Sequence, residues 1–304
     1  MEHRNQHWIP RSYLKEWCDP LHKNSVIHRY DREGRYVDWR PPSRVFSEND
    51  LYTTSKDGQR NVDVEVKFLK ALEDVFLKVR ARIEKEPVLT PQAKRALTYF
   101  VSVMRNRSPA ARDHWQNFKD RIVKAADQMA EAIAKATPAE RLRMAQALRS
   151  PMPSKGGSIS HEEAKAAAAQ PFGEWLPRHA VIEAKLLERL TLTVLKAPDG
   201  IGFITSDSPV VWHDAAHKIG DRRRRIGLGY KYIEVTMPIS PSMCLLFDHT
   251  DRDGVAEIDQ EAVDIINSRT LGQCEVYIIA NSPDLVVDWF EVEVSEKGEE
   301  PAPS

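Results

Sequence analysis

Cysteine, long apolar runs and an excess of charge of either sign are all scarce in this 304-residue chain. Its three cysteines, Cys18, Cys244 and Cys274, lie far apart and form no CxxC pair, which argues against a disulfide framework and a structural zinc site. No apolar run reaches the roughly 18 residues of a membrane-spanning helix, and no basic stretch followed by an apolar segment opens the chain. These absences predict a cytoplasmic protein that does not engage a membrane.

The charge balance excludes a strong general attraction to polyanions. Lysine and arginine total 44 and aspartate and glutamate 45, a formal net charge of -1. Only local clusters can bind phosphates, and the clearest is Asp-Arg-Arg-Arg-Arg at residues 221–225. This cluster keeps nucleic acid as one candidate partner; the alternative is an ordinary solvated surface.

Several common catalytic motifs are also missing. The chain has no GxxxxGK[ST] loop, no complete dinucleotide fingerprint and no GxSxG elbow. Kinases, P-loop ATPases, common dehydrogenases and α/β-hydrolases are therefore excluded. The sequence predicts no set of metal ligands and identifies no cofactor.

What the sequence does contain predicts an α+β fold. With 41% hydrophobic and 29% charged residues, the chain can bury a sizeable core, and we expect a single domain over residues 1–296 followed by a disordered tail at 297–304. Within it we expect an N-terminal motif and β-hairpin at 1–60, a helical region at 61–189 and a mostly antiparallel sheet with a crossing helix at 190–296. Its strands are expected to form one sheet. Pro-containing helix starts are expected at Thr90 and Thr137, with a helix break at Ser108-Pro109, and the crossing helix is expected to begin at Asp259.

Short polar and aromatic motifs recur at intervals along nearly the whole chain. They comprise residues 5–10, 13–14, 17, 51–53, 107–109, 203–209 and 238–241. In order and spacing they resemble the domain-of-unknown-function 4238 family, with Trp8 and Ile9 in place of the family's Tyr and Val. The resemblance implies a bacterial or phage-borne cytosolic protein without an established activity, and it marks His7, Arg107 and Asp207 as motif positions.

His7 is the first candidate catalytic residue. It follows Asn5 and Gln6 and precedes an aromatic and apolar run, so its surroundings are expected to be fixed. Imidazole titrates near neutral pH and can act as a general base or as a metal ligand. Asn5 and Gln6 are then expected to bind the substrate. The alternative is a structural histidine that bonds a backbone carbonyl.

Asp207 is the second candidate, because it follows an apolar strand at the point where site residues often lie. Thr205 and Ser206 precede it and are candidate substrate ligands, as is Asn267 on the crossing helix. The alternative for Asp207 is a turn in which its carboxylate accepts backbone hydrogen bonds.

Arg107 is the third candidate, at the end of an otherwise apolar helix. Its guanidinium can neutralise an anionic substrate or pair with Asp207. The alternative is a cation placed at a helix C-terminus by the helix dipole.

Two functions from different classes follow. In the first, the protein is a hydrolase acting on nucleic acid or another phosphate-bearing substrate in a defence or toxin role. His7 is its base, Asp207 orients His7 or holds a metal, and Arg107 stabilises the transition state. In the second, it is a non-catalytic binding or scaffold protein whose polar residues fix the N-terminal segment to the sheet. The first requires the three side chains to meet in one pocket.

Overall fold

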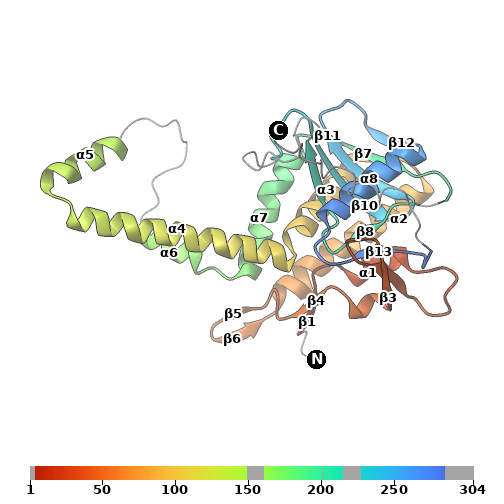
Figure 1. Ribbon diagram of the computed structural model, residues 1–304, viewed down its shortest axis with the longest axis horizontal. Helices are drawn as coiled ribbons and strands as arrows, with labels where there is room; N and C mark the ends of the chain where they lie inside the picture. Colours follow the sequence, from red (N-terminus) through yellow and green to blue (C-terminus); the bar gives the residue numbers. More distant parts are fainter. Residues whose placement is uncertain (1–3, 149–160, 201, 215–226, 285–304) are drawn as a thin grey trace, which may run out of the picture.

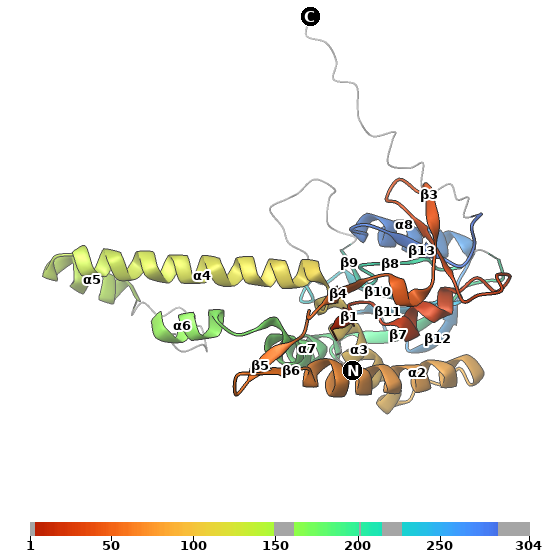
Figure 2. The ribbon, with the colours of Figure 1, turned by 90° about the horizontal axis from the view of Figure 1, so that it is seen from below.

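The computed structural model describes residues 4–148, 161–200, 202–214 and 227–284 and has an α+β fold (Figure 1). Strands dominate the N-terminal part, helices the middle, and strands with one helix the C-terminal part, as the sequence predicts. A body of sheets and packed helices carries a helical arm that projects to one side in both ribbon views (Figures 1 and 2). None of the helices in the described ranges combines the length and apolar character needed to cross a membrane.

The N-terminal segment forms short elements that fold onto the body. Strand β1 pairs antiparallel with β4, and β2 pairs antiparallel with β3, which confirms the predicted hairpin. The elements are β1 (Asn5–His7), α1 (Arg11–Leu14), the 3-10 turn η1 (Lys15–Trp17), β2 (Ile27–Tyr30), β3 (Tyr36–Arg40), the 3-10 turn η2 (Pro42–Arg44), β4 (Ser47–Asn49), β5 (Thr54–Lys56) and β6 (Gln59–Asn61).

The helical middle begins with a π-helical turn, η3, that leads directly into α2. The predicted cap at Thr90 forms, because its hydroxyl accepts a hydrogen bond from the amide of Ala93. The predicted break at Ser108 is also the start of the next helix, where the Ser108 hydroxyl accepts from the amide of Ala111. The elements are η3 (Val64–Leu69), α2 (Lys70–Lys85), α3 (Pro91–Asn106), α4 (Pro109–Lys135), α5 (Pro138–Leu148), α6 (His161–Ala168) and α7 (Phe172–Leu187).

The C-terminal strands form part of two sheets, so the expectation of one sheet is wrong. A five-stranded sheet has the order β12-β7-β11-β10-β9, antiparallel except for the β12–β7 pair. A four-stranded sheet has the order β3-β2-β13-β8, so the N-terminal hairpin pairs with the last described strand. The elements are β7 (Thr191–Lys196), β8 (Thr205–Ser206), β9 (Val211–Asp214), β10 (Ile233–Ser240), β11 (Met243–Asp248), β12 (Gly254–Glu257), α8 (Gln260–Gln273) and β13 (Ile278–Ala280).

The largest core joins the helices, the five-stranded sheet and the N-terminal segment. Phe76 of α2 and Phe100 of α3 stack with their ring centroids 3.7 Å apart, and Tyr13 of α1 packs against both rings. The predicted crossing helix, α8, begins at Asp259, whose carboxylate accepts from the amide of Ala262. It packs its own apolar residues on the strands, in a smaller core.

Candidate functional site

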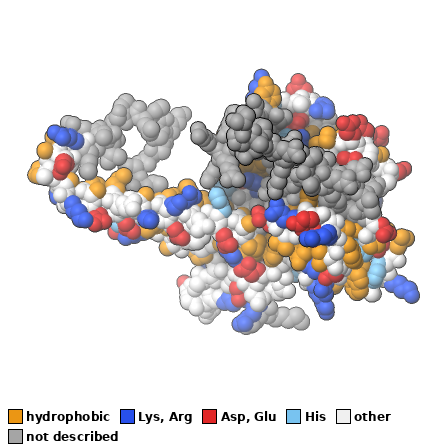
Figure 3. Space-filling model, in the orientation of Figure 1, with side chains coloured by type: hydrophobic (Ala, Val, Ile, Leu, Met, Phe, Trp, Pro, Cys, Tyr) orange, Lys and Arg blue, Asp and Glu red, His pale blue; other side chains and the backbone are white. Residues whose placement is uncertain are grey.

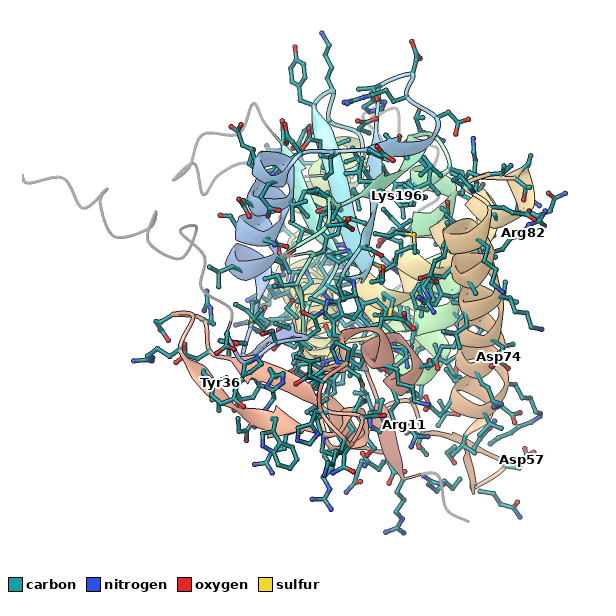
Figure 4. The ribbon with its side chains drawn as sticks, turned by 90° about the vertical axis from the view of Figure 1, so that its right-hand side faces the viewer. Arg11, Tyr36, Asp57, Asp74, Arg82 and Lys196 are labelled. Atoms are coloured by element: carbon teal, nitrogen blue, oxygen red, sulfur yellow. The ribbon has the colours of Figure 1, made fainter. Side chains whose placement is uncertain are left out.

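A cavity of about 770 Å³ opens beside β1, between the N-terminal segment and the start of α2. Its volume falls within the range of small-molecule sites. Figure 4 labels two of the residues that line it, Arg11 on α1 and Asp74 on α2. The chemically active side chains in its lining are His7, Arg11, Ser12, Lys15, Glu65, Lys70, Glu73, Asp74 and Arg107.

His7 enters this cavity from the end of β1, opposite Ser47 of β4. Its Nε2 lies 3.3 Å from the carbonyl oxygen of Ser43, which can only accept a hydrogen bond. In the neutral ring this contact places the proton on Nε2 and leaves Nδ1 as the basic nitrogen. Burial lowers the pKa of His7, and the charges of Arg11 and Arg107 lower it further, while the bond to Ser43 acts in the opposite direction. The imidazole is therefore neutral near pH 7, with Nδ1 able to accept a proton.

Arg107 is the C-cap of α3 and is 1% exposed. Its Nη2 donates to the backbone carbonyl of His7 at 2.6 Å, and its Nη1 donates to Glu73 at 2.8 Å. Its Nε donates to the hydroxyl of Tyr52 at 3.3 Å, and that hydroxyl in turn donates to the carbonyl of Arg107. Burial opposes the charge of Arg107, but neighbouring Tyr52 and the acidic residues Glu73 and Glu65 outweigh this effect and raise its pKa. Arg107 is thus a permanently charged group that joins three elements at the base of the cavity.

Glu65 is one of several charged cavity residues that were not candidates from the sequence. It lies in the π-helical turn η3, and its Oε2 is buried without a hydrogen-bond partner. Burial raises the pKa of this carboxyl and Glu73 adds to the rise, against the opposing charges of Arg107 and Arg11. A signal was present in the sequence: Glu65 lies three residues after Val62 and four before Leu69, which is the spacing of one helix face. π-helical turns also recur at functional sites.

Further polar groups of the cavity are free to bind a ligand. The hydroxyl of Ser12 is buried and has no hydrogen-bond partner. Arg11, Lys15 and Lys70 are exposed at the rim, and they make no ion pair with any residue that the structure describes. Glu73 already pairs with Arg107, and the three cations outnumber the one exposed carboxylate of the lining, Asp74. The opening therefore has a net positive character that suits an anionic ligand.

The residues before His7 divide into one that lines the cavity and one that supports it. Asn5 is exposed and belongs to the cavity lining. Gln6 is 0% exposed: its Oε1 accepts from the amide of Tyr52, and its Nε2 donates to Thr53. Gln6 therefore holds the Leu51–Tyr52–Thr53 motif against β1, and the cavity lining does not include it.

Asp207 does not line the cavity of His7 and Arg107, so the expected convergence of three side chains is not found. Its two carboxylate oxygens accept from the backbone amides of Glu275 and Val276, at 3.0 and 2.7 Å. Pairing of β13 with β8 brings those amides to Asp207. This geometry fits the alternative in which the Asp207 carboxylate accepts backbone hydrogen bonds, here from amides between α8 and β13.

Thr205, Ser206 and Asn267 are likewise buried and already bonded within the fold. Thr205 donates to the hydroxyl of Tyr13, which donates to the carbonyl of Pro238, both at 2.7 Å. The hydroxyl of Ser206 accepts from the amide of Ser208. Asn267 accepts from the amide of Ile204 and donates to the carbonyl of Gly202. None of the three lines the cavity, so the structure does not bring them to the candidate site.

Other parts of the molecule offer less chemistry. A hollow of about 360 Å³ beside Leu72 and Tyr99 and another of about 400 Å³ beside Lys94 and Asp253 contain none of the unpartnered buried oxygens. Among the described residues, no three His, Cys, Asp or Glu side chains are grouped so as to hold a metal ion. The basic cluster at 221–225 lies outside the described residues.

Comparison with known proteins supplies a family for the chain. No curated protein and no solved structure matches it significantly. One family model does match, described as a protein of unknown function (DUF4238), and the match runs from residue 5 to residue 284. It covers every described strand and every residue of the cavity lining. The chain therefore belongs to the DUF4238 family.

Proposed function

We propose that the cavity at His7 is the active site of a hydrolase that acts on a phosphate-bearing substrate. The observation that carries this proposal is the pairing of a neutral imidazole with a buried, unpartnered carboxyl in one cavity with a cationic rim. Such a pair of oppositely perturbed groups is typical of acid–base catalysis. Nucleic acid is one substrate of this class, and a role in defence or as a toxin in the cytoplasm is part of the proposal.

The proposed reaction uses both groups in one displacement at phosphorus. Nδ1 of His7 takes a proton from water as the water oxygen forms a bond to phosphorus. The ester P–O bond breaks, and the protonated carboxyl of Glu65 gives its proton to the leaving oxygen. Arg11, Lys15 and Lys70 bind the phosphate oxygens, while Arg107 holds the backbone of His7 in place and adds positive charge at the base. Asp207 has no part in this scheme.

The test is phosphate-ester cleavage by the full chain. Labelled single- and double-stranded RNA and DNA, a phosphomonoester and a phosphodiester are incubated with the protein, with chelator and with added divalent cations. We expect cleavage of at least one substrate that falls roughly 100-fold or more in His7→Gln and Glu65→Gln. A rate that rises with pH through the lowered pKa of His7 and falls through the raised pKa of Glu65 is expected for the scheme.

A matched pair of lysine variants separates the site from general charge. Lys70 lines the cavity, whereas Lys78 is exposed on the same helix and does not line it. Lys70→Ala is expected to raise KM several-fold, and Lys78→Ala is expected to behave as the wild type. Equal effects of the two substitutions would remove the cavity from the proposal.

The alternative of a non-catalytic binding protein is favoured by one observation. The aromatic N-terminal residues are fixed to the sheet by Tyr13 and by Trp17, whose Nε1 donates to the carbonyl of Phe203 at 2.8 Å. The motif residue Thr205 serves this attachment through Tyr13, and Gln6 ties β1 to Tyr52 and Thr53. If the cavity binds a phosphate-bearing ligand and no substrate of the panel is turned over, the protein is a binding module.

A further inference from the structure

The arm formed by α4, α5 and α6 exposes a row of large apolar side chains along α4. Helix α4 has 27 residues and so extends for about 40 Å at ~1.5 Å per residue. Phe118, Ile122, Met129 and Ile133 are 40, 40, 54 and 40% exposed. We call these four residues the apolar stripe. Exposed apolar surface of this extent on a projecting helix indicates a binding surface.

The stripe lies on the side of α4 that α6 does not cover. Helix α6 is attached through Asp127, whose carboxylate contacts His161 at 2.7 Å and Lys165 at 3.1 Å. At ~100° per residue, Phe118 and Met129 are about 180° and about 160° round the helix from Asp127. The two sides of the arm are therefore different: one carries the α6 contact, and the other carries the stripe, in which Phe118 stacks on Trp115 of the same helix.

The order of residues in the stripe is symmetric about its own centre. Between Ile122 and Met129 the same face of the helix presents only Ala125 and Ala126. When two copies of α4 are laid antiparallel about this point, Phe118 of one copy faces Ile133 of the other, and Ile122 faces Met129. Each large side chain meets a large apolar partner, and the small alanines permit close approach where the helices cross.

The charge of α4 favours a second copy of the helix over a membrane or nucleic acid as the partner. No charged residue lies among residues 118, 122, 125, 126, 129 and 133, so antiparallel pairing buries no charge. Helix α4 carries five basic and four acidic residues, a near balance unlike the basic face of helices that bind membranes or nucleic acid. The arm also points away from the body, which leaves room for a second arm alongside it (Figures 1 and 3).

We propose that the apolar stripe of α4 is a self-association surface that pairs two copies of this chain antiparallel through their arms. The pairing is isologous, because each copy contributes the same residues on both sides of a two-fold axis near Ala125 and Ala126. Four side chains from each copy form a small interface, so the dimer is concentration-dependent.

The experiment measures the mass of the full chain by sedimentation over a wide range of concentration. The wild type is expected to shift from 34.7 kDa toward twice that mass as concentration rises. The double variant Ile122→Glu, Met129→Glu is expected to remain at 34.7 kDa throughout. Lys124→Glu, on the same helix but outside the stripe, is the matched control and is expected to dimerise like the wild type. Circular dichroism checks that all three proteins keep their helix content.

Cross-linking tests the direction and register of the pairing. In a Cys18→Ser background the other two cysteines are buried, and Ala125→Cys places one thiol next to the proposed axis. We expect this variant to form a disulfide-linked dimer on oxidation, and Lys124→Cys to form several-fold less. A wild type that stays monomeric at every concentration overturns the proposal, as does a dimer that persists in the stripe variant. If another segment of the chain covers the stripe, the wild type stays monomeric at every concentration, and the proposal is overturned.

Discussion

The side chain of Arg107 donates from Nη2 to the backbone carbonyl of His7 at 2.6 Å, across one hundred residues of sequence. The same guanidinium contacts Glu73 and Tyr52, so one buried cation fixes the end of β1, the start of α2 and the end of α3. The position of His7 in the cavity therefore depends on Arg107. This arrangement makes Arg107 a structural and an electrostatic residue at once.

Arg107→Ala is expected to destabilise the protein by about 3 kcal/mol or more, because it leaves buried acceptors without a donor. Arg107→Lys keeps the charge but can no longer bond Glu73, Tyr52 and the His7 carbonyl together, so we expect an intermediate loss. Denaturation by urea gives both values. A loss below ~0.5 kcal/mol in Arg107→Ala would contradict the structural role assigned here.

Tyr13→Phe removes the hydroxyl that joins the N-terminal segment to Thr205 and to the carbonyl of Pro238. Because both partners are buried, we expect a loss of about 1–3 kcal/mol in unfolding free energy. The double variant Tyr13→Phe, Thr205→Val should lose less unfolding free energy than the sum of the losses in the two single variants, since the two hydroxyls bond each other. Tyr232→Phe, at a residue that is 53% exposed, is the control and is expected to change stability by under ~0.5 kcal/mol.

Asp207→Asn separates a structural from a catalytic aspartate. One amide oxygen can still accept from the chain at residues 275–276, but the new NH₂ group faces a backbone N–H, so a loss of about 1–3 kcal/mol is expected. Turnover per folded molecule should not change. Asp251→Asn, at an exposed position, controls for the change in charge. A folded Asp207→Asn protein with strongly reduced turnover would return Asp207 to the catalytic group.

Local features of the fold could be predicted because they depend on neighbouring residues alone. The hydroxyl of Thr90 and the carboxylate of Asp259 each accept from an amide three residues further along the chain, and the local sequence predicts both caps. Strand β13 pairs with the C-terminal strand β8 on one side and with the N-terminal strand β2 on the other. The β13–β2 pairing joins residues about 250 positions apart in the sequence. No local pattern specifies that choice, which is why one sheet was expected where two exist.

The candidate site shows the same division. His7 and Arg107 were identified from the sequence, and the structure places both at one cavity. Asp207 was grouped with them because a polar residue after a strand is typical of a site, but the neighbouring β13 supplies its two amide partners. Glu65 was missed although its spacing from Val62 and Leu69 places it on the apolar face of a regular helix, and the structure places it in the cavity.

Glu65→Gln is expected to stabilise the protein at neutral pH. Burial raises the pKa of Glu65 in the folded state, so its protonated form contributes stability below the unfolded value of about 4.5 that is lost as pH rises through the folded pKa. Glutamine is neutral at every pH and does not lose this contribution. The difference in unfolding free energy, variant minus wild type, should therefore grow between pH 4.5 and pH 8.

Urea titrations at the two pH values measure that difference. Glu86→Gln, an exposed glutamate beyond the end of α2, is the control and should show no such growth. A Glu65→Gln protein less stable than the wild type at pH 8 would mean that the carboxylate is ionised and bonded in the folded state. The unpartnered Oε2 argues against that outcome.

His7 is expected to titrate below its usual value of 6.5, because burial and the charges of Arg11 and Arg107 disfavour the imidazolium. A lowered pKa contributes stability above about pH 6.5 that is lost as pH falls through the folded pKa, so the wild type should lose stability there relative to His7→Gln. Nuclear magnetic resonance of the ring protons gives the pKa directly. Arg11→Gln removes one of the opposing charges and should move the pKa of His7 upward, which a histidine shifted by burial alone would not do. A His7 that titrates at or above 6.5 would be charged too readily to serve as the base.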